Sequence, residues 1–224
     1  MTDAWAATEP QPQQAAAFVR ENTRLLSPPL VPEIRLHLAE ESLPIWAKTE
    51  EELEAHGLPP PFWSFAWAGG QALARYLLDH PELVVGRSVL DLGAGSGLVA
   101  IAAMKCGARG ALAAEIDAFG RAAIALNAAE NDVTVGISGS DVLDGTPAAD
   151  LVLIGDLFYE RGLAERVLAV IAQVRHAGAD VLVGDPKRTY FPLDQFERIA
   201  EYYVPVTREL EDVGIKHSAV WRPL

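Results

Sequence analysis

The sequence predicts an α/β fold built on a doubly wound, seven-stranded, mostly parallel sheet with an antiparallel strand at its edge. Two observations lead to this prediction. From residue 87 onward, short apolar runs alternate with helical segments, which is typical of parallel sheets that are covered on both faces. The last two strand-like stretches are joined directly by residues 211–214, which predicts an antiparallel pair at the sheet edge.

The chain before the main domain is expected to be an N-terminal extension, residues 1–58, that packs on the core. Residues 1–16 are rich in Ala, Gln, Pro and Thr, and we expect them to be frayed. Residues 18–39 contain three prolines, which predict short irregular pieces around a small strand at 34–38. Residues 48–56 are acidic and predict a surface helix or loop.

In the main domain, residues 59–224, an aromatic segment at 62–67 runs into two glycines, and residues 71–79 have the apolar spacing of a helix. The predicted strands are 88–92, 110–115, 133–138, 151–155, 180–184, 204–210 and 215–221. The predicted helices are 98–106, 119–131, 163–176 and 193–202. Gly107 is placed to end the first of these helices in a left-handed cap.

Composition narrows the classes of function. The formal charge of −13 would repel the phosphate backbone of a nucleic acid, so no nucleic-acid partner is expected. A single cysteine and five scattered histidines give no disulfide framework and no metal-binding pattern, so we expect no metal. No apolar stretch is long enough to cross a bilayer, and residues 1–14 do not resemble a secretion signal, which predicts a cytoplasmic protein without a membrane partner.

The strongest local signal is the sequence Asp-Leu-Gly-Ala-Gly-Ser-Gly, which runs from Asp91 to Gly97 directly after an apolar strand. Gly93 and Gly95 have no side chains, so the backbone of this loop can approach a ligand closely. The helix that follows offers unpaired N–H groups at its first turn. A nicotinamide-binding loop would have a glycine at Leu98, and the Lys-Ser/Thr pair of a phosphate-binding P-loop is missing. The alternative is a tight strand-to-helix turn that binds no ligand.

Acidic residues lie at the end of the second predicted strand and just after the third. Glu115 lies 18 residues after Gly97, close to the separation at which doubly wound folds place a carboxylate against ribose hydroxyls. Asp117 is the competing candidate, although it lies past the strand end and is placed to cap the next helix. Asp141 follows the third strand, where an adenine amino group would sit, and a solvated turn is its alternative role.

The glycine loop and the second-strand acid resemble those of the seven-stranded S-adenosylmethionine-dependent methyltransferases. The resemblance extends from about residue 60 to the C-terminus, which makes residues 59–224 the expected methyltransferase domain. It implies a Rossmann-like sheet with the strand order 3-2-1-4-5-7-6 and S-adenosylmethionine as cofactor. The cofactor-binding residues that it implies are Trp67, Asp91, Gly93, Gly95, Gly97, Glu115 and Asp141.

Within that superfamily, the chain is most similar to the protein-lysine methyltransferases with an Asp-x-x-Tyr motif after the fourth strand, here Asp156 to Tyr159. The aromatic entry at 62–74 and the Gly-Asp-Pro turn at 184–186 look most like the group that modifies the electron transfer flavoprotein beta subunit. In that group the turn commonly continues Gly-Arg, whereas this chain has Lys187 before its arginine. The resemblance implies a monomeric enzyme that N-methylates a lysine of that subunit.

Methyl transfer from a sulfonium is an in-line displacement, so the protein mainly aligns the reactants and excludes water. A lysine must lose its proton first, which costs about 4–5 kcal/mol at pH 7. Because a carboxylate raises the pKa of a neighbouring amine, we expect Asp156 to hold and orient the lysine. Tyr159 is expected to line the channel. The alternative is an ordinary strand-end acid beside a packed aromatic.

The sequence allows more than one role for Trp63 and for the turn at 185–188. Trp67 is expected to cover the cofactor, and Trp63 either does the same or anchors the N-terminal segment to the core. Asp185 and Arg188 either contact substrate or belong to a plain turn.

Other functions also fit the sequence: methylation of another protein such as a ribosomal protein, methylation of a small-molecule amine, or a non-catalytic cofactor-binding module. Methylation of a nucleobase amine is disfavoured because no proline follows Asp156 in the fourth-strand motif.

Overall fold

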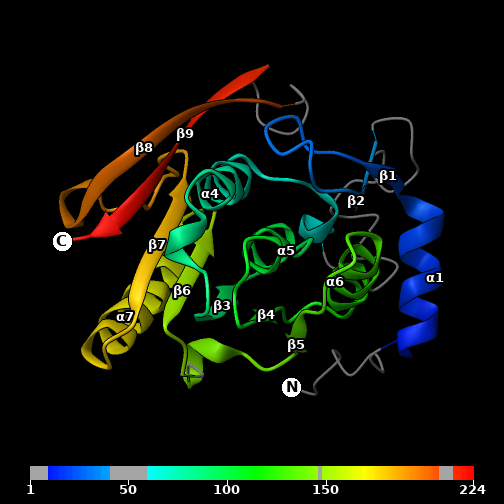
Figure 1. Cartoon of the computed structure of the whole chain (residues 1–224), viewed down its shortest axis with the longest axis horizontal. Helices are drawn as coiled ribbons and strands as arrows, with labels where there is room; N and C mark the ends of the chain where they lie inside the picture. Colours follow the sequence, from blue (N-terminus) through cyan, green and yellow to red (C-terminus); the bar gives the residue numbers. More distant parts are fainter. Residues whose placement is uncertain (1–9, 41–59, 146–147, 207–213) are drawn as a thin grey trace, which may run out of the picture.

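The computed structural model describes residues 10–40, 60–145, 148–206 and 214–224. A seven-stranded sheet with the order β5-β4-β3-β6-β7-β9-β8 lies at its centre (Figure 1). The strands are β3 (Ser88–Leu92), β4 (Gly110–Ala114), β5 (Gly136–Ser138), β6 (Leu151–Gly155), β7 (Asp180–Asp185), β8 (Phe196–Pro205) and β9 (Ile215–Pro223).

The pairing of these strands confirms the predicted fold class. Strands β3 to β7 pair in parallel, whereas β9 runs antiparallel to both β7 and β8. Numbered 1 to 7 from β3 onward, their spatial order is 3-2-1-4-5-7-6. The predicted strands at 88–92 and 151–155 have the observed bounds, whereas the one predicted at 133–138 is shorter and covers only Gly136–Ser138.

Helices cover both faces of the sheet (Figure 1). On one face lie α4 (Ala68–Asp79), α5 (Leu98–Lys105) and α6 (Ala118–Glu130), and on the other lies α7 (Arg161–His176). Because side chains alternate along a strand, Leu151 and Leu153 of β6 pack with the first group, while Val152 and Ile154 pack with α7. None of the helices in the described residues is long and apolar enough to cross a membrane.

The N-terminal part is more regular than we expected. Helix α1 (Pro12–Asn22) starts within the stretch expected to be frayed, with a proline in its first turn and a hydrogen bond from the Gln11 N–H to the Gln14 side chain. Two short strands follow, β1 (Arg24–Leu26) and β2 (Leu36–Leu38). Helix α1 lies against α6 (Figure 1). The acidic stretch at 48–56 lies outside the described residues.

The helix predicted at 193–202 is wrong. Leu193–Gln195 form a single 3-10 turn, η4, and β8 then runs from Phe196. Leu193, Phe196 and Ile199 recur every third residue, as on a helix face. The same stretch is rich in aromatic and apolar residues that suit a strand, and pairing with β9 along the whole length of β8 selects the strand.

An aromatic cluster covers the sheet beside this strand. Phe191 packs against Phe158, Phe196 and Trp221, with ring centroids 4.9 to 5.1 Å apart. All four side chains are buried. These side chains belong to the core cluster on the α7 face of the sheet, and they cover that face beside β8 and β9.

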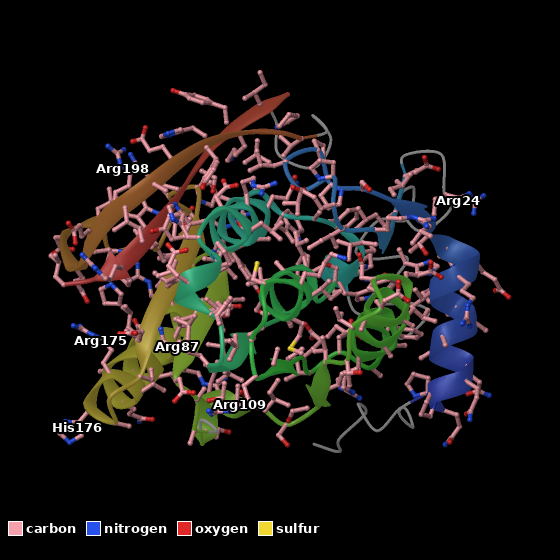
Figure 2. The ribbon with its side chains drawn as sticks, in the orientation of Figure 1. Arg24, Arg87, Arg109, Arg175, His176 and Arg198 are labelled. Atoms are coloured by element: carbon pink, nitrogen blue, oxygen red, sulfur yellow. The ribbon has the colours of Figure 1, made fainter. Side chains whose placement is uncertain are left out.

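The two ends of the parallel strands differ in character. At their amino ends, Arg87 pairs with Asp180 at 2.7 Å and Arg109 pairs with Asp150 at 3.1 Å. Figure 2 labels both arginines. Their carboxyl ends carry the glycine loop and the acids that the sequence singled out. In open parallel sheets, ligands bind at the carboxyl ends of the strands.

Candidate active site

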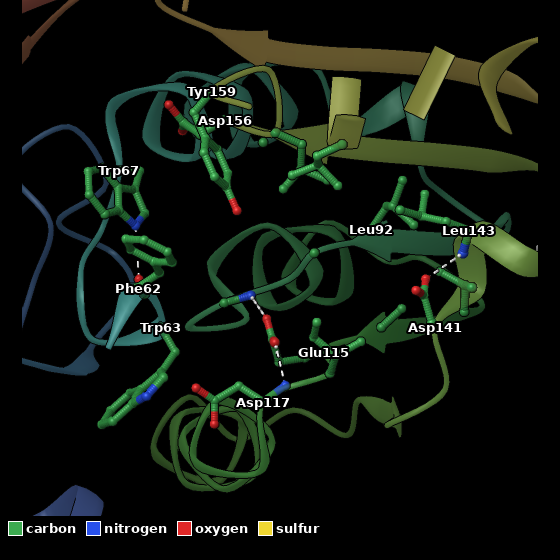
Figure 3. Close-up of a pocket in the computed structure, with 18 of the residues that line it drawn as sticks. Phe62, Trp63, Trp67, Leu92, Glu115, Asp117, Asp141, Leu143, Asp156 and Tyr159 are labelled. Atoms are coloured by element: carbon green, nitrogen blue, oxygen red, sulfur yellow. Dashed lines mark hydrogen bonds between the residues drawn. The ribbon is translucent and has the colours of Figure 1, made fainter. Parts of the chain in front are cut away.

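A cleft of about 500 Å³ lies at the carboxyl ends of the parallel strands (Figure 3). Its volume falls within the range of small-molecule and cofactor sites. It is lined by the aromatic entry, the glycine loop, the loops after β4, β5 and β6, and the turn after β7. Its lining residues include Phe62, Trp63, Trp67, Gly93, Gly95, Glu115, Ile116, Asp117, Asp141, Val142, Leu143, Asp156, Tyr159, Arg166 and Arg188.

The glycine loop forms one wall of the cleft. Gly93 has a φ of +66°, and a Cβ there would lie 2.8 Å from the Leu157 side chain. Gly97 has a φ of +79°, and a Cβ there would lie 3.1 Å from Ile124. Only glycine meets both demands without strain. Gly95 faces the cleft, where its N–H is directed at the acid of the neighbouring strand.

Glu115 sits across this loop (Figure 3). Its Oε2 accepts a hydrogen bond of 2.8 Å from the Gly95 N–H, and its Oε1 accepts one of 2.8 Å from the Asp117 N–H. Burial raises the pKa of the Glu115 carboxyl. Asp117 also lines the cleft, but its Oδ1 caps α6 by accepting a hydrogen bond from the Phe119 N–H.

Asp91 lies behind the loop and does not line the cleft. Its carboxylate is buried and accepts a hydrogen bond of 2.9 Å from the Ala100 N–H of α5. Burial raises the pKa of Asp91 to about 7. Gly97 is likewise turned away from the cleft, toward Ile124. Both residues are placed to shape the loop, whereas Gly93, Gly95 and Glu115 reach the cleft itself.

Asp141 lies at the far side of the cleft from Trp67 (Figure 3). Its Oδ1 accepts a hydrogen bond from the Leu143 N–H in the 3-10 turn η3 (Val142–Asp144), and its Oδ2 pairs with Arg166 at 2.8 Å. The Arg166 hydrogen bond holds the pKa of Asp141 below its usual value.

Asp156 is held from two sides. Its backbone has a φ of +59°, and its Oδ2 accepts a hydrogen bond of 2.8 Å from the Gly70 N–H at the start of α4. Its Oδ1 accepts from Arg188, at 2.9 Å from Nε and 2.6 Å from Nη2. Both side chains are largely buried, with 8% of Asp156 and 17% of Arg188 exposed.

Sequence reasoning did not foresee this pair, although a signal was present. Gly155 of β6 pairs with Gly184 of β7, so the residues that follow these glycines meet at the same sheet edge. The backbone N–H of Arg188 donates to Asp185 Oδ1 at 2.7 Å, which completes the turn. Lys187 has a φ of +65°, a conformation that favours glycine.

Asp185 is more isolated than Asp156. Its side chain is fully buried, and its Oδ2 has no hydrogen-bond partner among the described residues. Burial, and then the charge of Asp156, raise the pKa of Asp185 to about 7.

The aromatic residues surround the entrance. The Trp67 Nε1 donates to the Phe62 carbonyl at 2.9 Å, and the Arg188 guanidinium lies 5.2 Å from the centre of the Trp67 ring. Tyr159 is half exposed, with its ring 5.8 Å from that of Phe62. Trp63 lines the cleft and is also buried in a cluster with side chains of α1 and α6. It therefore borders the proposed cofactor site and also anchors the N-terminal segment to the core.

Known proteins share part of this sequence pattern and the fold. The family model described as ribosomal protein L11 methyltransferase (PrmA) matches residues 72–155. A putative RNA methyltransferase from Pyrococcus horikoshii shares the fold, with a TM-score of 0.51 and 13% identity, over 95% of this chain and 98% of its own. A putative methyltransferase in complex with SAH has a TM-score of 0.50 and 13% identity, over 70% of this chain and 50% of its own.

Sequence relatives are more similar. The electron transfer flavoprotein beta subunit lysine methyltransferase of Danio rerio is 38% identical over 217 residues, covering 92% of this chain and 81% of its own. The Xenopus laevis protein of the same name is 37% identical over 223 residues, covering 94% and 89%. The human protein is 37% identical over 213 residues, covering 92% and 80%. The chain therefore belongs to the electron transfer flavoprotein beta subunit lysine methyltransferase family.

Proposed function

We propose that this enzyme transfers a methyl group from S-adenosylmethionine to the side-chain amine of a lysine on the electron transfer flavoprotein beta subunit. The names of its relatives support the substrate. The observation that carries the proposal is the cleft itself. One wall is the glycine loop with Glu115, and another holds Asp156 and Tyr159, so donor and acceptor sites open into one space.

The residues of the cleft fit the proposed cofactor. Glu115 presents a carboxylate beside the glycine loop, which suits the two hydroxyl donors of a ribose. Ile116, Val142 and Leu143 offer apolar surface for an adenine ring, and Asp141 an acceptor for its amino group. We assign Asp91 and Gly97 to holding the loop that these groups need. When bound, S-adenosylmethionine supplies a methyl group on a positively charged sulfur, which keeps the bonding electron pair when an amine takes the methyl in line.

The protein's own groups would then hold the lysine and keep water out. Asp156 is fixed by the Gly70 N–H and Arg188, so its orientation is set before substrate arrives. Tyr159 and Phe62 form an aromatic entrance that suits the aliphatic part of a lysine side chain. Trp67 lines the cleft beside Arg188. No Ser, Cys or His nucleophile is needed for such a transfer.

Further parts of the proposal concern the whole protein. We propose residues 59–224 as the methyltransferase domain and residues 1–58 as an extension that packs on it, supported by the contact of α1 with α6. The net charge of −13 supports a protein partner over a nucleic acid. We also propose that the enzyme acts as a monomer in the cytoplasm.

The test is methylation of purified electron transfer flavoprotein with labelled S-adenosylmethionine. We expect label on lysine of the beta subunit and none on RNA. Asp156→Asn should lower kcat by about 100-fold or more, because the amine is misplaced without the carboxylate, while leaving affinity for S-adenosylhomocysteine unchanged. Asparagine tolerates a positive φ and can still accept from Gly70.

The matched control is Asp144→Asn, which changes an exposed acid paired with Arg166 of the same cleft without altering the Asp156 wall. It should keep the wild-type kcat. Label on ribosomal protein or on a free amine instead of the beta subunit would contradict the proposed substrate. Unchanged turnover in Asp156→Asn would remove Asp156 from the catalytic residues.

A further inference from the structure

The wall of the cleft that holds Asp156 also holds a cation. We propose that Arg188 is a positioning residue that offsets the charge of Asp156, so that the target lysine is held as a neutral amine. This inference rests on the proposed function, because it concerns how the same cleft receives its lysine.

The contact between the two side chains is close and shielded. Two guanidinium nitrogens of Arg188 donate to Asp156 Oδ1, at 2.9 and 2.6 Å, while Oδ2 is bonded to the Gly70 N–H. The Trp67 ring covers the guanidinium. The backbone N–H of Arg188 is fixed by Asp185. An arginine that is held at three points stays in place when substrate enters.

The chemistry of the reaction gives this contact a purpose. An ammonium has no free electron pair and cannot take a methyl group, so the lysine must lose its proton before transfer. A carboxylate alone would hold the lysine but would also favour its charged form. A guanidinium stays charged at any accessible pH. Beside the Asp156 carboxylate, the Arg188 guanidinium offsets the negative charge that would otherwise raise the pKa of the lysine. The carboxylate can still accept a hydrogen bond from the neutral amine.

The other ionisable groups around Arg188 do not supply this charge. Asp185 faces it from the end of β7, and Tyr159 faces it from the loop after β6. Both of these groups are acids. The other arginine among the described lining residues, Arg166, pairs with Asp141 and Asp144 on the far side of the cleft. Among the described residues that line the cleft, Arg188 is therefore the cation placed beside Asp156 and the lysine.

The first test is the pH dependence of kcat, which reports ionisations in the enzyme–substrate complex. In Arg188→Gln the rising limb of the profile should move to higher pH by about one unit or more. Turnover should approach the wild-type value at high pH, and the KM for the beta subunit should not rise. Arg188→Lys should keep a profile near that of the wild type. Arg166→Gln is the matched control: it removes an arginine from the same cleft and should leave the midpoint unchanged.

The second test does not depend on turnover. The beta subunit is titrated into enzyme loaded with S-adenosylhomocysteine, in buffers of different ionisation enthalpy, to count the protons released. At a pH below the pKa of free lysine, the wild type should release close to one proton per lysine bound. Arg188→Gln should release clearly less than the wild type, because its lysine enters as an ammonium.

The outcomes separate this inference from the proposed function. An Arg188→Gln profile that falls equally at all pH values, with unchanged proton release, overturns the role of Arg188 while methylation of the beta subunit stands. If Arg188→Gln does not fold, the proton count of the wild type decides: release of clearly less than one proton per lysine bound contradicts the inference, because the lysine is then held as an ammonium despite Arg188. A wild-type enzyme that does not methylate the beta subunit refutes the proposed function itself.

Discussion

Two acids at neighbouring strand ends show how strongly the surroundings of a residue decide its behaviour. Asp156 follows β6 and is paired with a guanidinium and a backbone N–H. Asp185 ends β7, accepts a hydrogen bond from the Arg188 N–H at Oδ1, and has a buried Oδ2 with no partner among the described residues. A buried carboxyl group with unmet hydrogen-bonding capacity is costly to ionise. Asp156 therefore suits a charged role, whereas Asp185 favours its neutral form.

The buried position of Asp185 predicts a dependence of stability on pH. Its pKa is raised to about 7 in the folded chain, above the ordinary value of an unfolded aspartate. The folded state thus holds a proton that the unfolded state releases. This contribution to the free energy of unfolding is fully present below about pH 4 and is lost as the pH rises through about 7.

Asp185→Asn should remove that loss, because an amide has no charge to desolvate and its oxygen can still accept from the Arg188 N–H. Urea unfolding of both proteins across this pH range measures the effect. The variant should gain stability relative to the wild type as the pH rises, on the order of 1 kcal/mol or more. A difference that stays constant with pH would show that Asp185 does not titrate as described.

At the scale of elements, α6 connects the N-terminal strands to the glycine loop. The buried Asn127 accepts from the His37 N–H of β2 at 2.7 Å and donates to the Ser96 carbonyl of the loop at 2.8 Å. One turn later, Asn131 bonds both backbone groups of Arg35. Both asparagines therefore hold the segment around β2, but only Asn127 also holds the loop.

This difference predicts separate effects on stability and binding. Asn127→Ala and Asn131→Ala should each destabilise the fold by about 1–3 kcal/mol, because buried backbone groups lose their partners. Only Asn127→Ala should also weaken binding of S-adenosylhomocysteine, by roughly fivefold, since a less ordered loop must be fixed on binding. Thermal unfolding and calorimetric titration measure the two effects. Equal weakening of binding in both variants would contradict a specific link through Asn127.

The elements differ in how far the sequence signals that specify them reach along the chain. The glycine loop and the parallel strands were predictable because their signals are local: apolar runs, glycines and an acid at a fixed spacing. The stretch at 193–202 was not, because its apolar spacing fits a helix while its residue types suit a strand, and pairing with β9 decides. The contact between Asp156 and Arg188 joins residues 32 positions apart, so it depends on the parallel pairing of β6 and β7.

At the scale of the whole molecule, the amino ends of the parallel strands carry stabilising ion pairs, and their carboxyl ends carry the cleft. Ion pairs such as Arg87 with Asp180 tie the amino ends of the strands together (Figure 2). The carboxyl ends leave room for the cleft, which the N-terminal part helps to close: Trp63 lines the cleft while packing with Val19 of α1 and Ala123 of α6. The geometry of the cleft thus depends on the N-terminal helix α1 as well as on the sheet and the helices that cover it.

Calorimetric titration of S-adenosylhomocysteine into the purified protein tests the central claim most directly, because that claim is that the glycine loop and Glu115 hold the adenosyl group. We expect one binding site per chain. Glu115→Gln should weaken binding by roughly 10-fold or more, since hydrogen bonds to a charged group are lost, whereas Asp117→Asn, which keeps the cap of α6, should change it little. The account is contradicted if the wild type shows no binding heat, or if Glu115→Gln binds as tightly as the wild type.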